Sequence, residues 1–525
     1  MAKLAKMPTA GPRSAVRTTR EVVLNAQGGK GYAREARSEL FLLATSNMVG
    51  EDTFYESASD RDERYLRLVR EVTMVDPQWV RDMLVWLRTH GNIRSAAIVG
   101  AIEYGIAGGI EPRAVLDAVM QRADEPGEAL GYWLAKYGRP LPKWLKKALG
   151  DGALRLYTEA SAFKYDSGPV RFADVIEMSH ITRKHDKDGL FLWLLDRRHD
   201  RVDFESRGYG FLPVVRAREQ ISEMGEHARE ALLSDPTLMK RAAMTWEALS
   251  SFGPMDDKAW SAVIPQMGYM ALLRNLRNFD QAGLDREVRK DIAARLSDRE
   301  QVLRSRQLPF RFFSAYQHVE SDFWKPVLNE ALEHSISNVP LLSGQTLVMI
   351  DNSGSMGGSV SGKSSVTYAM QAALFGMALA KAQPKDTVEV WGFSTQATRF
   401  DFNHGSEVLP QAQRFAEHTP GGGTYTATCL SEIFDDRKRR GLLIPRRIVI
   451  LSDEQIGENA WRDSLSLSQV VPPEVALHTF NLGGYRVAHE ESGIKRRHTY
   501  SGVTDASFRL MGLVESGQNG VWPWE

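Results

Sequence analysis

Cysteine is almost absent from this chain of 525 residues, which contains Cys429 alone. A single thiol cannot close a disulfide within the chain, and it cannot supply the several sulfur ligands of a structural zinc site. Disulfide scaffolds and cysteine-based zinc folds are therefore excluded. We expect Cys429 to be a small buried residue of a helix.

Long apolar runs are also missing. No stretch approaches the about 18 apolar residues that a membrane-spanning helix requires, and the first residues lack the apolar core of a signal peptide. We therefore expect a soluble, cytoplasmic protein without membrane contact.

Neither sign of charge is in excess, because Lys plus Arg and Asp plus Glu both number 66. The molecule thus lacks an overall basic field, and any binding to nucleic acid requires a local patch. The uneven part is the start, where the first fifty residues carry eight Lys or Arg and three Glu. We interpret residues 1–36 as a basic arm that is solvated and frayed, with a phosphate contact as the alternative.

The length predicts two to four domains, and the sequence pattern changes once, near residue 340. Before that point, apolar residues recur at helical spacing in short stretches separated by Gly, Pro, Asp or Asn. This predicts an all-α domain over 37–340, built of short antiparallel helices like a HEAT or armadillo solenoid, although no strict repeat period is visible. The predicted helices include 62–75, 77–90, 94–105, 112–122, 142–149, 215–232 and 285–304.

Beyond residue 340, short apolar runs alternate with helical segments. This alternation predicts a doubly wound α/β domain with a parallel sheet over 341–525. The predicted strands are 347–350, 388–393, 447–451 and 475–482, and the predicted helices are 364–382, 427–438, 460–469 and 505–516.

One polar motif follows the first of these strands. Asp351, Ser353 and Ser355 stand at alternate positions in a turn that contains glycine. Open α/β sheets bind ligands at the carboxyl ends of their strands, and hard oxygen donors suit Mg²⁺ or Mn²⁺. The alternative is an ordinary polar turn, since Asp, Asn, Ser and Gly are the commonest turn residues.

Two later segments favour the metal site. A Gly-Gly-Gly-Thr stretch ends in Thr424, and a second apolar strand ends in Ser452-Asp453. Together the three segments resemble the metal-ion-dependent adhesion site of von Willebrand factor A domains. The resemblance implies that a divalent cation, Mg²⁺ before Mn²⁺, is surrounded by Asp351, Ser353, Ser355, Thr424 and Asp453.

The helical part carries further motifs. Met270-Ala-Leu-Leu-Arg-Asn-Leu276 resembles a motif of the TROVE module, and three other stretches fit the same module in the same order. These are Gly50–Tyr55, Lys164-Tyr165 followed by Met178-Ser-His180, and Leu308-Pro-Phe310. A TROVE module followed by a von Willebrand A domain resembles the Ro autoantigen family, in its bacterial type.

This resemblance implies a ring of helical repeats whose gap is bridged by the A domain. It also implies a non-catalytic scaffold for non-coding RNA quality control, monomeric within a ribonucleoprotein. Small structured Y RNA, or tRNA-like Y RNA, would bind the outside of the ring, and single-stranded 3′ ends of misfolded RNA would enter its centre. A 3′-to-5′ exonuclease would be tethered through the RNA.

The residues needed for RNA contact are present as basic runs. RNA binding through the backbone requires Lys and Arg for phosphates, with His or aromatic side chains for stacking. The alternatives are solvated helix faces for the charges, a helix cap for His180, and internal hydrogen bonds for Arg274 and Asn275. The candidate RNA-binding residues are Lys143, Lys146, Lys147, Lys164, Arg171, His180, Arg183 and Lys184.

Two positions depart from the family pattern. Tyr425 follows Thr424 where many Ro proteins carry an acid, and Glu454 follows Asp453 where many carry Asn. Neither change removes a metal ligand. A metal-dependent protein-docking scaffold without RNA binding remains the alternative function. A hydrolase is disfavoured because no His or Lys adjoins the metal motif in the sequence.

Overall fold

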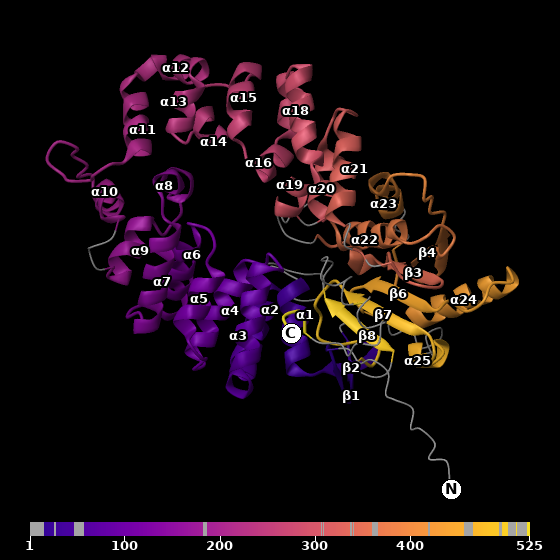
Figure 1. The fold of residues 1–525 in the computed structure, drawn as a ribbon. Helices are drawn as coiled ribbons and strands as arrows, with labels where there is room; N and C mark the ends of the chain where they lie inside the picture. Colours follow the sequence, from indigo (N-terminus) through magenta and orange to yellow (C-terminus); the bar gives the residue numbers. More distant parts are fainter. Residues whose placement is uncertain are drawn as a thin grey trace, which may run out of the picture.

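The computed structural model describes residues 15–25, 28–46, 57–181, 186–305, 307, 309–336, 339, 341–359, 366–417, 421–455, 466–492, 496–501, 511 and 522–525. We call residues 36–336 the helical half and residues 341–501 the sheet half. Figure 1 shows the helical half as an arch whose two ends both meet the sheet half. Among the described residues, no helix is long and apolar enough to cross a membrane.

The arch consists of short helices in sequence order, as the periodicity predicts. They are α1 (Ala36–Ser46), α2 (Ala58–Val75), α3 (Pro77–Thr89), α4 (Ser95–Ile106), α5 (Pro112–Val119), α6 (Glu125–Tyr137), α7 (Lys143–Leu156), α8 (Glu159–Tyr165), α9 (Phe172–Ser179), α10 (Asp188–Arg198), α11 (Pro213–Glu223), η1 (Gly225–His227), α12 (Ala228–Ser234), α13 (Pro236–Arg241), α14 (Trp246–Leu249), η2 (Ser250–Phe252), α15 (Asp257–Val263), η3 (Ile264–Gln266), α16 (Tyr269–Arg274), α17 (Leu276–Ala282), α18 (Arg286–Ser297), α19 (Arg299–Ser305), α20 (Pro309–His318) and α21 (Trp324–Ser335). Two predicted helices are each divided in the structure: 215–232 is broken at 224–227 and 285–304 is broken at Asp298.

Local sequence signals set the ends of these helices. Between α2 and α3, Asp76 caps the second helix by accepting a hydrogen bond from the Trp79 amide, and Pro77 occupies its first turn. Proline is tolerated there because the first amides of a helix have no partner within the helix. Neighbouring helices then bury fully apolar faces, as with Leu84, Ile102 and Leu116 in one continuous core.

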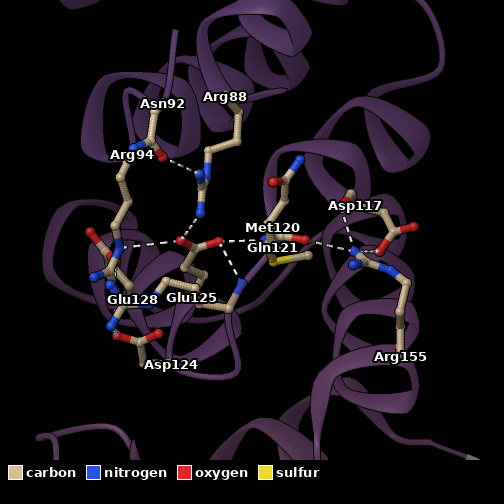
Figure 2. A network of polar contacts seen from close by, with 11 residues as sticks. Arg88, Asn92, Arg94, Asp117, Met120, Gln121, Asp124, Glu125, Glu128 and Arg155 are labelled. Atoms are coloured by element: carbon tan, nitrogen blue, oxygen red, sulfur yellow. Dashed lines mark hydrogen bonds and ion pairs between the residues drawn. The ribbon is translucent and has the colours of Figure 1, made fainter. Parts of the chain in front are cut away.

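Buried ion pairs tie the early helices together (Figure 2). The Glu125 carboxylate is fully buried at the start of α6 and accepts a hydrogen bond of 2.6 Å from Arg88 of α3. Arg94, which precedes α4, lies 3.4 Å from the same carboxylate and 2.8 Å from Asp124. A buried carboxylate is tolerated only when it is paired in this way, so this network fixes the register of three helices.

The sheet half is a six-stranded sheet with the strand order β5-β4-β3-β6-β7-β8, in which only β5 is antiparallel to its neighbour. Side chains alternate between its two covered faces: Val348 and Ile350 point to the core shared with α22, while Leu347 and Met349 point to the core shared with α24. Its elements are β3 (Thr346–Asp351), η4 (Gly354–Gly357), α22 (Tyr368–Ala382), β4 (Val388–Phe393), β5 (Ala397–Phe400), α23 (Val408–Glu417), α24 (Thr426–Arg439), β6 (Arg447–Ser452), α25 (Leu467–Val470), β7 (Ala476–Asn481) and β8 (Arg497–Ser501).

All four predicted strands are present. Three elements, β5, α23 and β8, were missed. Strands β5 and β8 are brief and lack an apolar run, whereas the helical spacing of the buried residues Val408, Ala412 and Phe415 in α23 was overlooked. The predicted helix over 505–516 lies outside the described residues apart from Met511. Cys429 is buried in α24, as expected.

The expectation of a frayed basic arm is wrong for its described part. Strands β1 (Thr18–Leu24) and β2 (Lys30–Arg34) form an antiparallel hairpin that bonds to the sheet half. The Tyr32 amide donates to the Ala488 carbonyl at 2.8 Å, and the Thr18 amide donates to the Ser492 carbonyl at 3.3 Å. These bonds satisfy backbone groups that water would otherwise solvate, so the segment is held against the sheet half.

The other end of the chain lies on the helical half. Trp522 and Trp524 stack on each other with ring centroids 5.5 Å apart. They meet Trp79 at 4.9 and 5.3 Å and Phe41 at 5.3 and 5.7 Å. The first and last described segments therefore cross over, each packing on the half that is remote from it in sequence.

Candidate metal centre and nucleic-acid interface

Five oxygen-bearing residues gather at the carboxyl edge of the sheet. Asp351 ends β3, and its carboxylate accepts hydrogen bonds from the Ser353 amide at 2.9 Å and the Ser452 hydroxyl at 2.5 Å. The Ser353 and Ser355 hydroxyl oxygens lie 3.3 Å apart. The alternation seen in the sequence thus becomes a turn that brings carboxylate and hydroxyl oxygens together.

The two later segments reach the same edge. The Gly354 amide donates to the Gly422 carbonyl at 3.0 Å, which brings the glycine loop before Thr424 against the serine turn. Asp453 follows β6, the strand paired with β3, and its carboxylate is hydrogen-bonded by Ser355. The structure therefore links the three predicted segments, and every one of the five side chains is buried.

The two acids at this edge are buried, and burial disfavours their ionised forms. Desolvation raises the pKa of Asp351 and, together with the charge of Asp351, that of Asp453. Two buried carboxyls without a counter-charge resist ionisation, and a divalent cation would supply that charge. The donor set fits a hard cation, because it offers only carboxylate and hydroxyl oxygens. The described residues contain no group of three or more His, Cys, Asp or Glu that could hold a metal ion, and this donor set includes only two acids.

A second buried charge cluster adjoins the edge. Glu454 forms an ion pair with Arg34 of β2 and accepts a hydrogen bond from Asn481. Arg64 of α2 donates to the Gly484 carbonyl at 3.2 Å. Sequence reasoning identified Glu454 but missed Arg34, because the two residues are 420 positions apart and no local pattern joins them.

The strongest basic group of the candidate RNA-binding residues opens α7. Lys143, Lys146 and Lys147 lie in its first turns, which contain no acidic residue and no side-chain cap. Lys143 and Lys147 are exposed. The positive charges of these lysines are repelled by the positive end of the α7 helix dipole. This end of α7 therefore favours a bound anion.

The segment before α7 lies beside the end of α9, since the Arg139 guanidinium is 3.9 Å from the Met178 sulfur. His180 follows directly, with an exposed side chain and a left-handed backbone (φ 53°) that ends the helix. His180 thus caps α9 through its backbone, and its exposed imidazole has no hydrogen-bond partner among the described residues. The α7 lysines and His180 therefore lie on neighbouring elements.

The remaining candidate RNA-binding residues differ in their exposure and in their partners. Lys164 is exposed at the end of α8, with its ammonium 5.2 Å from the centre of the Tyr165 ring. Arg171, which caps the start of α9, already has a partner within the fold. Its guanidinium donates to the carbonyl of Asp166, the residue that caps the end of α8. Arg183 and Lys184 lie outside the described residues.

Asn275 makes internal hydrogen bonds, which was the alternative to RNA contact for this residue. Its side-chain amide donates to the Ala271 carbonyl at 2.8 Å, and its amide oxygen accepts from Asn278 at 2.7 Å. The residue is buried between α16 and α17. Its polar groups are therefore used within the fold.

Both halves of the chain are similar to domains of known proteins. The sequence model of the TROVE domain matches residues 237–365, and that of the von Willebrand factor type A domain matches residues 346–455. The crystal structure of the Deinococcus radiodurans Ro (Rsr) protein is similar with a TM-score of 0.61 at 18% sequence identity, covering 92% of this chain and 100% of that one.

These matches confirm the resemblance seen in the sequence and the predicted fold class. The TROVE match covers the last helices of the helical half and runs into the start of the sheet half, and the von Willebrand match begins at Thr346, the first residue of β3. The chain therefore combines a TROVE domain with a von Willebrand factor type A domain in the fold of the Ro protein.

Proposed function

We propose that this protein is a non-catalytic scaffold that binds RNA through the helical half. The observation that carries the proposal is the lysine group at the start of α7, where three cations meet the positive end of a helix without an acidic neighbour in that turn. Phosphate is the ligand that relieves this repulsion. The TROVE match and the Ro fold support the same function.

We propose the RNA classes from the resemblance of the sequence to the Ro family. Small structured Y RNA, or tRNA-like Y RNA, binds the outer surface, and the single-stranded 3′ end of a misfolded RNA enters the arch, with an exonuclease recruited through the RNA. In this proposal the RNA-binding domain spans 37–340 and the A domain spans 341–525. The protein acts as a cytoplasmic monomer within a ribonucleoprotein.

Replacing the three α7 lysines tests the site. We expect Lys143→Ala/Lys146→Ala/Lys147→Ala to weaken binding of a hairpin RNA about tenfold or more in filter binding and to reduce its salt slope by about three, one for each lysine that no longer meets a phosphate. The matched control is Lys240→Ala/Lys258→Ala/Lys290→Ala, which removes three exposed lysines elsewhere in the helical half. Equal reductions of affinity in both variants would assign the binding to general charge.

For the A domain we propose a bound Mg²⁺, with Mn²⁺ able to replace it, held by Asp351, Ser353, Ser355, Thr424 and Asp453. The support is the convergence of their segments and the raised pKa of both acids. A divalent cation there would neutralise the two carboxylates and tie β3, the glycine loop and β6 together. These five residues would hold and orient the ion.

The raised pKa values predict how Mg²⁺ stabilisation depends on pH. Groups with a raised folded pKa stabilise the fold while protonated, and this contribution is lost as pH rises through the folded pKa. Mg²⁺ offsets that loss but competes with protons at low pH. In thermal unfolding, we expect Mg²⁺ to raise Tm more at about pH 8 than at about pH 6.

Two variants complete this measurement. Asp453→Asn should abolish the Mg²⁺ effect at both pH values, whereas Asp401→Asn, which alters an exposed acid of the sheet half, should retain it. A Mg²⁺ effect that is equal at both pH values and unchanged in Asp453→Asn would refute the proposed ligand set.

A further inference from the structure

The turn between α24 and β6 exposes two adjacent large apolar side chains. Leu443 is 84% exposed and Ile444 is 53% exposed, although they lie between a helix and a central strand of the sheet. We call residues 441–446 the Leu443 loop. An adjacent exposed apolar pair also occurs at Met74 and Val75, so exposure alone does not mark a contact surface. The Leu443 loop differs in its anchored backbone and in the charges around it.

A buried arginine holds this loop in place. The Arg437 guanidinium is almost completely buried and donates to the Leu443 carbonyl at 2.6 and 3.2 Å. It also donates to the Gln345 side chain at 2.6 Å and pairs with Glu389. The exposed side chains therefore stand on an ordered backbone, and a partner loses little conformational entropy by binding them.

Most of the exposed charges at the end of α24 and in the loop are positive. The exposed acids nearby are Asp435 of α24 and Glu474, which precedes the Ala476 amide that donates to the Arg446 carbonyl. Arg440 pairs with Asp436 and with Glu389, each at 2.7 Å, so nearby acids are already neutralised. Arg439 lies 3.6 Å from Asp436 and keeps 75% of its side chain exposed. In the described part of the chain, the exposed Lys438 and Arg446 form no ion pair.

We propose that the Leu443 loop docks an acidic segment of a partner protein, in which adjacent aliphatic side chains are flanked by Asp or Glu. An apolar centre with a charged rim is the anatomy of a protein interface. RNA would leave the leucine and isoleucine without an apolar partner. A lipid surface would require a wider apolar face for stable anchoring.

The position of the loop separates this surface from the candidate metal centre. The loop leads directly into the first residue of β6, Arg447, whereas Asp453 follows the other end of that strand. A partner docked there leaves the carboxyl edge of the sheet and the α7 lysines uncovered. The proposal therefore does not depend on RNA binding or on the cation.

Fluorescence anisotropy on the full-length protein tests the proposal. The probe is a labelled helical peptide with two adjacent leucines flanked by glutamates. We expect it to bind, and we expect Leu443→Ser/Ile444→Ser and Lys438→Glu/Arg439→Glu each to weaken it about tenfold or more. The control Met74→Ser/Val75→Ser, which alters exposed apolar residues of α2, should leave its affinity unchanged.

Two further probes decide the chemistry. The same peptide with lysine in place of glutamate should not bind, and vesicles containing anionic phospholipid should not sediment with the protein. The proposal is overturned if the acidic peptide fails to bind, if it binds the Leu443→Ser/Ile444→Ser variant equally, or if the vesicles bind through the loop instead.

Discussion

Replacing Arg34 by alanine is expected to lower the free energy of unfolding by about 3 to 5 kcal/mol, the range for breaking a buried ion pair on one side. Arg34 and Glu454 are both buried, and the substitution leaves the Glu454 carboxylate without its cation next to Asp453. The hairpin would also lose one of its attachments to the sheet half, although the backbone bonds of Thr18 and Tyr32 would remain. Urea unfolding followed by circular dichroism measures the change.

Two variants separate pairing from packing. Arg34→Met/Glu454→Leu removes both charges and should recover much of the stability, because no buried charge is left unpaired. Arg20→Ala, on the exposed side of the same hairpin, should change stability by less than about 0.5 kcal/mol. A loss of stability with Arg20→Ala as large as that with Arg34→Ala would contradict the buried-pair explanation.

Replacing the last two tryptophans, Trp522 and Trp524, by alanine is expected to have the second large effect on the free energy of unfolding. Trp522→Ala/Trp524→Ala should cost about 3 kcal/mol, since buried Trp→Ala changes cost about 3 to 5 kcal/mol and these rings are half-buried. The substitution removes ring packing on Trp79 at 4.9 Å and on Phe41 at 5.3 Å. Thermal unfolding and protease sensitivity of α1–α3 measure the result.

A double-mutant cycle with Trp79 shows whether this ring packing itself carries the effect. Trp79→Ala combined with the tryptophan pair should cost less than the sum of the separate effects, because both changes remove the same packing. Phe211→Ala, which alters an aromatic side chain that is 90% exposed, is the matched control and should be neutral. Full additivity would show that these tryptophans act elsewhere.

The metal motif was predictable because its signals are local. Each segment consists of an apolar run or glycine loop followed by its ligand, and parallel strands bring their carboxyl ends to one edge. The resemblance to the von Willebrand adhesion site placed Asp351 and Asp453 in one site, and the parallel pairing of β3 with β6 brings both to the same edge. Ser452 was not recognised as a partner of Asp351, although it stands beside Asp453 in the same motif.

Contacts between distant segments could not be predicted. Arg34 meets Glu454 across 420 positions, and the hairpin that carries it gains its stability from the sheet half. Residues 18–34 look like a polar arm in isolation because their partner is formed by the far end of the chain. The same applies to Trp522 and Trp524, whose packing partners lie in α1 and α3.

Charge runs predicted candidate RNA contacts but not their surroundings. Lys143 and Lys147 stand exposed at the start of a helix, whereas Arg171 is used to support the start of α9. The sequence shows all three as basic residues within basic runs. Only the backbone geometry separates a side chain that can meet phosphate from one that already has a partner.

Filter binding of the native protein to a hairpin RNA with a single-stranded 3′ tail tests the central claim most directly. The salt concentration runs from about 50 to about 300 mM, where phosphate contacts weaken steeply. We predict binding at low salt and a slope of log K against log salt of about −3 or steeper. Absence of binding at about 50 mM salt would contradict the RNA-scaffold account.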